Sequence, residues 1–234
     1  MPNTVRNMHY DYKQKLNKID SSQNRNLKVP EIDWKLNEAM NIFIKMIAEP
    51  KYSPYGFESS QRSIDSIRPI VVENKELTLS KLSDKVFSAA LPDDYMIHLS
   101  SYGVCKKGTC SANIRTNIIQ HDDKETEFHI SNFEWRELNI MFAGNTIQVL
   151  TDETFTVDKV YLSYVRMPKY IHTAVDFVGG QYLMPDGETQ LTGYQNCELP
   201  IDVHNEVVDL AVLITTGDLL SNYQVKQTKT QMTN

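Results

Sequence analysis

The sequence "PEIDWKLNEAMNIFIKMIAEPKYSPYGFESSQRSIDSIRPIV", residues 30–71, decides the fold. Its first half predicts an amphipathic helix over residues 33–49, because apolar side chains recur at helical spacing and polar ones fall between them. These apolar residues are Leu36, Ala39, Met40, Phe43, Met46 and Ile47. We expect Asp33 to be the N-cap, and Pro50 and Pro54 to stop the helix. A second, shorter helix is predicted over residues 57–68.

The buried face of this first helix needs a partner at the other end of the chain. There, a third helix is predicted over residues 200–221, with Pro200 in its first turn. Its apolar stripe is wide enough to predict contacts on two sides, to the first helix and to the sheet or a neighbouring subunit. The stripe consists of Val203, Val207, Leu210, Ala211 and Ile214, widened by Val208 and Val212.

The segment between these helices, residues 86–185, reads as β-rich. Residues 112–118 alternate between apolar and polar, which predicts a half-buried strand, and residues 95–104 supply a strand to pair with it. The connection Cys105–Cys110 predicts a hairpin with Gly108 at positive φ. Two further strands are expected within "GNTIQVLTD" and "VDKVYLSYVRMP". We expect a loop with a short helix over residues 122–142, and short strands over 174–178 and 181–184.

These elements predict an α+β fold: a central antiparallel β-sandwich-like domain bracketed by N-terminal helices and a C-terminal helix. We expect one domain over residues 30–222. Residues 1–29 and 223–234 are polar and are expected to be extended arms. No run of about 18 apolar residues is present, so no membrane helix is predicted. The first residues lack a signal peptide's apolar segment, which favours synthesis in a cytosol.

Charge and chemistry argue against several classes of function. A net charge of −6 does not favour a surface that clamps nucleic-acid phosphates, but it is compatible with a wall past which DNA slides. The chain carries no nucleophile elbow, Walker loop or dinucleotide fingerprint, so no enzyme is predicted. Cys105, Cys110, His121 and His129 allow a zinc site on paper, but structural zinc prefers tighter ligand pairs. We therefore expect reduced cysteines and neither a metal nor a cofactor.

Four blocks of the sequence occur in an order that resembles the virion structural proteins of crAss-like bacteriophages, specifically the ring-forming proteins of the head-to-tail connector and tail barrel. The blocks are the helix at Leu36–Ala39, the segment Gly56–Glu58 with Asp65 and Arg68, the turn Leu91–Tyr95, and the helix Leu199–Ala211. The resemblance implies a β-rich domain flanked by terminal helices and repeated in a closed ring, since heterologous interfaces close into rings when the rotation permits.

The expected function is therefore a non-enzymatic ring subunit in a short-tailed phage virion, lining the conduit for viral DNA without binding it specifically. Its partners would be further copies of itself and adjacent ring, portal or tail proteins, with no membrane. We expect the turn and second helix to supply contacts between subunits, through Tyr52, Tyr55, Phe57, Arg62, Asp65 and Arg68. On the predicted helix Asp65 pairs with Arg62 or Arg68, which contributes only about 0–1 kcal/mol if exposed.

Two alternatives stay open. A head-completion adaptor or stopper would meet the portal directly and belongs to the same class of virion proteins. A β-sandwich module that binds host glycans belongs to a different class and requires an exposed aromatic platform. Its candidates are Tyr161, Tyr164 and Tyr170.

Overall fold

The computed structural model describes residues 4–19, 27–48, 65–121 and 131–217. The chain forms two compact units in place of the expected single domain. Unit 1 combines Met1–Ile70 with Pro168–Asn234, and unit 2 is the intervening Val71–Met167. The chain therefore begins and ends in the same unit, and the β-rich segment is an insertion into it. The expected α+β class is confirmed.

Unit 2 is built on an eight-stranded sheet with the order β1-β8-β4-β5-β6-β7-β3-β2. All pairings are antiparallel except β5 with β6, which run parallel. The strands are β1 (Val71–Leu77), β2 (Ser80–Lys81), β3 (Val86–Ala90), β4 (Tyr95–Lys107), β5 (Cys110–Ile118), β6 (Leu138–Ala143), β7 (Thr146–Leu150) and β8 (Thr156–Arg166). Gly108 joins β4 to β5 at φ 59°, as the hairpin prediction required.

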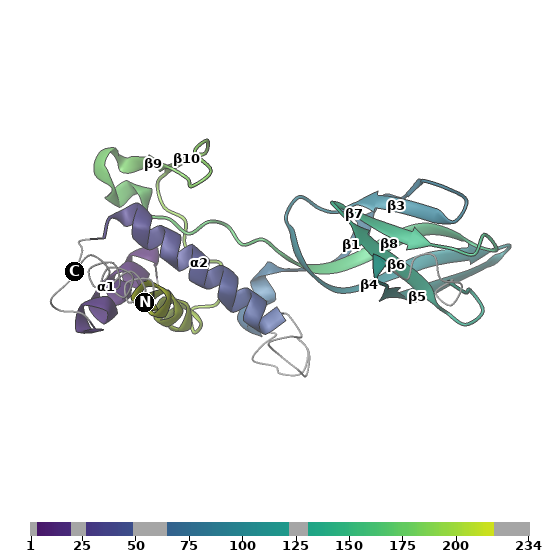
Figure 1. The fold of residues 1–234 in the computed structure, drawn as a ribbon, viewed down its shortest axis with the longest axis horizontal. Helices are drawn as coiled ribbons and strands as arrows, with labels where there is room; N and C mark the ends of the chain where they lie inside the picture. Colours follow the sequence, from purple (N-terminus) through teal and green to yellow (C-terminus); the bar gives the residue numbers. More distant parts are fainter. Residues whose placement is uncertain (1–3, 20–26, 49–64, 122–130, 218–234) are drawn as a thin grey trace, which may run out of the picture. The chain divides into compact units, whose positions relative to one another are not determined.

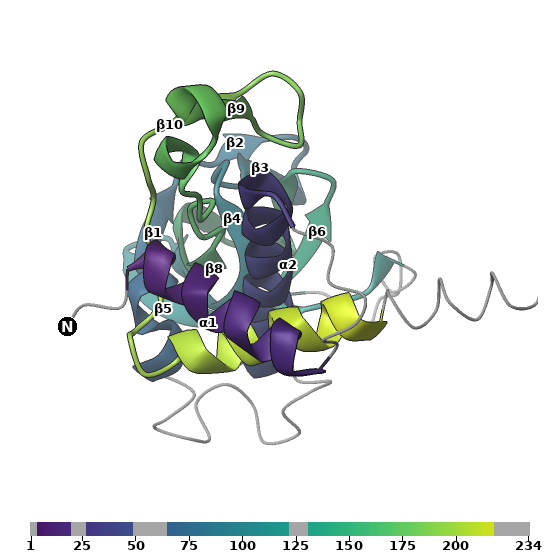
Figure 2. The same cartoon turned by 90° about the vertical axis from the view of Figure 1, so that its left-hand side faces the viewer.

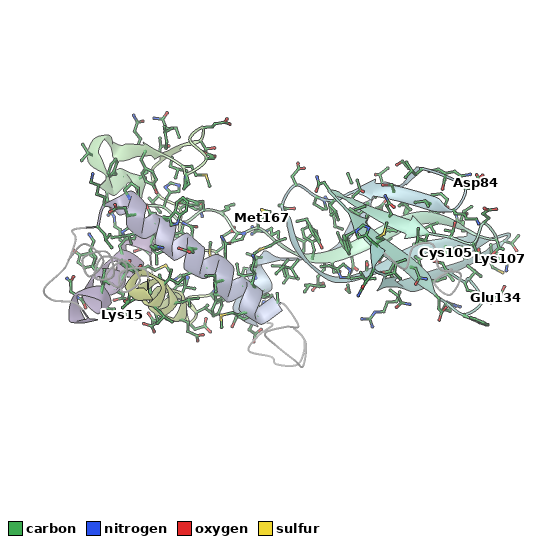
Figure 3. All side chains as sticks on the ribbon, in the orientation of Figure 1. Lys15, Asp84, Cys105, Lys107, Glu134 and Met167 are labelled. Atoms are coloured by element: carbon green, nitrogen blue, oxygen red, sulfur yellow. The ribbon has the colours of Figure 1, made fainter. Side chains whose placement is uncertain are left out.

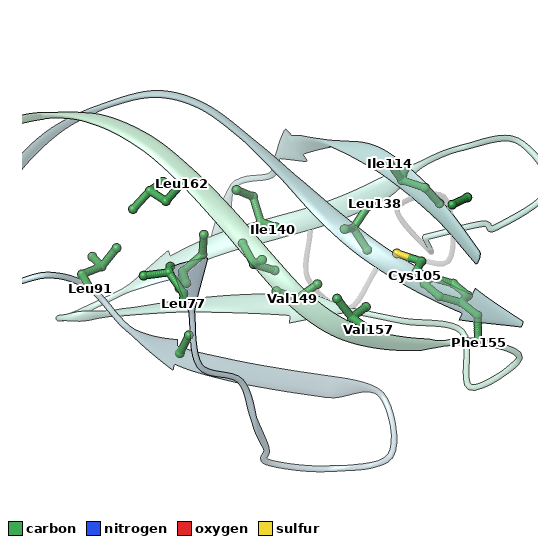
Figure 4. Packing of buried hydrophobic residues seen from close by; sticks show 14 of the residues in the cluster. Leu77, Leu91, Cys105, Ile114, Leu138, Ile140, Val149, Phe155, Val157 and Leu162 are labelled. Carbon is green, nitrogen blue, oxygen red and sulfur yellow. The ribbon is translucent and has the colours of Figure 1, made fainter. Parts of the chain in front are cut away.

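The core of unit 2 lies inside this curled sheet (Figure 4). Fully buried side chains of β4 and β8, such as Cys105 and Leu162, belong to one cluster with Ile140 of β6 and Val149 of β7. β5 shows the expected alternation, with its buried residues two apart. At the hairpin between β4 and β5, Lys107 forms an ion pair of 2.9 Å with Glu134, both labelled in Figure 3.

The loop prediction for residues 122–142 is wrong at its end, where β6 forms. Residues 122–130 lie outside the described part of the chain. In β6 the first four residues are all buried, so buried and exposed positions do not alternate along the strand. A strand covered on both faces has no period of two in its sequence, and this is why the pattern failed to show it.

Unit 1 contains α1 (Val5–Ile19), α2 (Val29–Ala48) and a helix over residues 204–217. α1 and the 204–217 helix lie side by side (Figures 1 and 2), joined by a hydrogen bond of 2.7 Å between Tyr12 Oη and Thr215 Oγ1. Residues 5–19 were expected to be part of an arm. They form a helix because their sparse apolar residues share one buried face: Val5, Met8, Tyr12 and Leu16.

The remaining differences lie at element ends. α2 begins at Val29, so Asp33 is inside the helix and not at its N-cap. Met46 is half exposed, whereas Ile44 takes the buried position. Residues 174–178 form 3₁₀ turns, η5 (Ala174–Asp176) and the start of η6 (Val178–Gly180), in place of the expected strand. The expected strand over 181–184 is β9 (Gln181–Leu183), which pairs with β10 (Gln190–Thr192). The C-terminal helix begins at residue 204 and not at residue 200, so residues 200–203 precede it.

Within the described residues, no helix has both the length and the apolar character needed to cross a membrane.

Candidate functional site: an aromatic pocket beside a buried polar cluster

Two polar side chains on the buried face of α2 hold an extended segment against the helix. Asn37 donates from Nδ2 to the carbonyl oxygen of Ile171 (2.7 Å) and accepts from the Ile171 backbone N–H at Oδ1 (2.8 Å). One turn earlier, Asp33 accepts from the backbone N–H of Thr173 (3.2 Å). Residues four apart on a helix are neighbours, and their spacing of about 5–6 Å approximates the repeat of two residues in an extended chain. The pair therefore fixes residues 171–173 along α2.

Asp33 is the centre of a buried polar cluster. It is fully buried, and Oδ1 accepts a hydrogen bond from Nε2 of His9 on α1 (2.7 Å). Oδ2 accepts a second bond, of 2.6 Å, from the hydroxyl of Tyr182 on β9. With the Thr173 bond, one carboxyl group thus joins three separate parts of unit 1. A buried carboxyl group requires such partners, because leaving it unsatisfied is costly.

Tyr182 connects this polar cluster to a pocket of about 400 Å³. We call it the aromatic pocket; it is lined by Pro30, Glu31, Trp34, Lys35, Tyr170, Tyr182, Leu183 and Pro185. The first four come from the first two turns of α2, and β9 with its following turn forms the opposite wall. Both views place β9 beside the N-terminal end of α2 (Figures 1 and 2).

The walls of the aromatic pocket are held in place. Phe177 meets the Tyr182 ring edge-on, with centroids 5.8 Å apart. The turn beyond β9 is closed by Asp186, whose carboxylate accepts from the backbone N–H groups of Glu188 and Thr189, both at 2.9 Å. Such an Asx turn stiffens the loop that carries Pro185. The pocket is therefore a preformed feature of unit 1, of the size of many ligand sites.

The electrostatics of the pocket favour binding over proton chemistry. Burial raises the pKa of Tyr170 to about 12. Burial and the hydrogen bond to Asp33 raise the pKa of Tyr182 far above its ordinary value. Both phenols are therefore neutral at pH 7. Lys35 forms an ion pair of 2.9 Å with Glu38, while Glu31 lies exposed at the rim. The interior is thus aromatic and aliphatic, with one exposed carboxylate at its edge.

Most of the interface residues predicted from the sequence lie outside the described residues: Tyr52, Tyr55, Phe57 and Arg62. The two that are described, Asp65 and Arg68, form an exposed ion pair of 3.8 Å, which is one of the two expected pairings. They do not line the aromatic pocket.

Two other candidate groupings were considered, an aromatic platform and a zinc site. Of the three tyrosines considered for an exposed aromatic platform, Tyr164 is buried in the core of unit 2 and therefore cannot belong to one. Tyr161 lies on β8 of unit 2, and Tyr170 belongs to unit 1. Cys105 is fully buried, and burial raises the pKa of its thiol to about 12, whereas Cys110 is exposed. Among the described residues, no three His, Cys, Asp or Glu side chains come together as metal ligands. His129 lies outside these residues.

Sequence reasoning missed the residues that build this site. Asp33 was predicted to be a helix cap and Asn37 was given no role. The two residues nevertheless lie four positions apart and next to the apolar stripe at Leu36 and Met40. Two short polar side chains on the buried face of a helix are the signal, because such groups must find hydrogen-bonding partners. Tyr182 carried no comparable signal, since its partner Asp33 is distant in sequence.

Comparison with known proteins adds no relatives: no protein-family model matches this chain, and no curated protein matches it significantly.

Proposed function

We propose that this protein is a structural subunit of an oligomeric ring in the connector or tail of a short-tailed bacteriophage. Copies of the chain associate through heterologous contacts and surround the conduit through which viral DNA leaves the virion. The order of the four sequence blocks that resemble crAss-like ring proteins supports the class of protein. The distribution of exposed apolar side chains in the described residues is the structural observation that carries the subunit contacts.

Most of the large hydrophobic side chains exposed in the described residues belong to unit 1. They are Tyr10, Trp34, Ile42, Met46, Val175, Val178, Leu183, Tyr194, Ile201 and Leu213. On α2, Ile42 and Met46 are four residues apart and therefore adjacent on its outer surface. Trp34 lies two turns earlier, at the aromatic pocket. Adjacent exposed apolar side chains such as Ile42 and Met46 support a protein–protein contact on this surface of α2.

The charge of the chain supports the proposed relation to DNA. With a net charge of −6, the protein as a whole repels a polyanion, and a conduit must let DNA pass without holding it. Partners of the ring would be adjacent portal, ring or tail proteins of the same virion.

The experiment is to measure the mass of the purified chain by native mass spectrometry across a wide concentration range, and to image the largest species by electron microscopy. The proposal predicts a closed ring of one stoichiometry. A chain that stays monomeric at every concentration and is missing from purified virions by mass spectrometry would overturn it.

Paired variants locate the contact on unit 1. Ile42→Glu with Met46→Glu places charge on two exposed positions of α2, so folding should persist while ring formation weakens. Ile118→Glu with Leu82→Glu is the matched control in unit 2, at side chains that are at least as exposed. Loss of the ring only in the control pair would move the subunit contact to unit 2.

A further inference from the structure

We propose that the aromatic pocket binds the segment Pro50–Tyr55, "PKYSPY", of a second copy of this chain. This inference rests on the proposed ring function and names the two surfaces that meet in it. Each subunit would offer its pocket to one neighbour and its segment to the other. That arrangement is heterologous, as a closed ring requires.

The chemistry of the pocket fits a proline-containing peptide. Trp34, Tyr170 and Tyr182 supply aromatic surface, and Pro30, Leu183 and Pro185 complete an apolar lining. Aromatic-lined grooves recognise proline-rich segments because the proline ring packs on aromatic faces and its fixed φ lowers the entropy lost on binding. The walls of the pocket are already in place in the described residues, so binding a peptide requires little reorganisation of the pocket.

The segment has the matching composition. Residues 50–55 contain two prolines and two tyrosines, and Lys51 supplies one positive charge. The rim of the pocket carries the exposed carboxylate of Glu31. A Lys51–Glu31 attraction at the rim would orient the peptide and would weaken with salt.

Chain length decides between the same subunit and a neighbour. The pocket lies at the N-terminal end of α2, at Trp34, whereas the helix ends at Ala48. At 1.5 Å rise per residue these positions are about 21 Å apart along the helix. Pro50 follows Ala48 by two residues, and two residues of extended chain span only about 7 Å. Pro50 therefore cannot reach the pocket of its own chain, whereas Pro54, six residues beyond Ala48, spans at most about 20 Å. Only a second copy can place the whole segment, with both prolines, in the pocket.

The test uses two full-length variants that each lack one half of the contact. Leu183→Glu places a charge in the pocket at an exposed side chain and should leave folding intact. Pro50→Ala with Pro54→Ala alters only the segment. Neither variant should form rings alone, but their equimolar mixture should form a dimer, because one good pocket and one good segment remain. Leu82→Glu, at a more exposed leucine in unit 2, is the control and should form rings like the wild type.

A peptide measures the contact directly. The segment variant with Trp135→Phe has an unoccupied pocket and Trp34 as its only tryptophan. Titration with the peptide EPKYSPYGF, residues 49–57, should change Trp34 fluorescence saturably. Binding should weaken at least about tenfold when Leu183→Glu is added, because charge replaces an apolar contact.

The outcomes separate this inference from the ring proposal. Wild-type rings together with unimpaired rings of Leu183→Glu would overturn the pocket contact and leave the ring function standing. Saturable binding of a peptide of residues 218–234, with none of residues 49–57, would assign the pocket to the C-terminal segment and would also overturn it. A wild-type monomer at every concentration that binds neither peptide would overturn both proposals.

Discussion

Replacement of Asp33 by alanine should destabilise unit 1 severely. The side chain is fully buried and accepts hydrogen bonds from His9, Tyr182 and Thr173. Alanine removes all three bonds at once. The backbone N–H of Thr173, which is itself buried, is left without this acceptor and has no freedom to turn elsewhere.

The magnitude follows from those three contacts. An unsatisfied buried N–H costs about 1–3 kcal/mol, and each of the two side-chain bonds contributes about 1 kcal/mol or more. We expect the free energy of unfolding of unit 1 to fall by about 3–5 kcal/mol. For a urea dependence of about 2 kcal/mol per molar, a loss of about 4 kcal/mol lowers the midpoint by about 2 M. Because domains are stable by only about 5–15 kcal/mol, this change is large.

The two tryptophans allow each unit to be followed separately. Trp34 lies in unit 1 and Trp135 in unit 2, and the chain has no others. Urea unfolding of Asp33→Ala in a Trp135→Phe background reports unit 1 through Trp34. The same substitution in a Trp34→Phe background reports unit 2, whose transition should stay unchanged if the units unfold independently.

Two further variants sharpen the test. Asp33→Asn should cost less than alanine, because Tyr182 and His9 can exchange donor and acceptor roles with an amide while the Thr173 N–H cannot. Asp209→Ala removes an exposed ion pair with Lys15 and should cost at most about 1 kcal/mol. If Asp33→Ala costs no more than Asp209→Ala, then the polar cluster does not hold unit 1 together and the reasoning is refuted.

Two other predictions concern packing and pH. Gly103→Ala should destabilise unit 2 by about 1–3 kcal/mol, because the added Cβ overlaps Cδ2 of the buried Leu138. The control is Ser111→Ala, at an exposed position on the neighbouring β5, which should have little effect on the unfolding transition reported by Trp135. If both variants unfold at the same urea concentration, the overlap at Gly103 is contradicted. Arg6 holds the pKa of Asp176 below its usual 3.8 through two hydrogen bonds, so this pair stabilises the fold above that pH and the stabilisation is lost as pH falls through the lowered pKa. Arg6→Gln should therefore lower the free energy of unfolding slightly at pH 7 and by nothing in acid, because the pair is exposed to solvent. A deficit that persists in acid would argue against the ion pair.

The periodic parts of the chain were predictable because each depends on local spacing. The amphipathic pattern placed α2 within a few residues, and the alternation around Ile114 placed β5. Turn chemistry at Gly108 placed the hairpin between β4 and β5. These signals reflect the 3.6-residue and two-residue periods of helices and strands, which need no knowledge of distant neighbours.

Elements whose burial depends on distant partners could not be predicted from the sequence. α1 has too few apolar residues to fold alone, and it is helical because Tyr12 and its neighbours pack into unit 1. β6 is covered on both faces and has no alternation to detect. The division into two units also has no local mark, since it follows from which contacts are made between residues far apart in the chain.

Asp33 shows most clearly which features the sequence determines and which only the tertiary structure decides. Composition and spacing in residues 30–48 determined that a helix forms there and which face it buries. Only the tertiary structure decided that Asp33 joins His9, Thr173 and Tyr182, and that Trp34 beside it opens into an aromatic pocket. The physical reason is that helix periodicity depends on residues close together in the sequence, whereas a buried carboxyl group accepts hydrogen bonds from donors elsewhere in the fold.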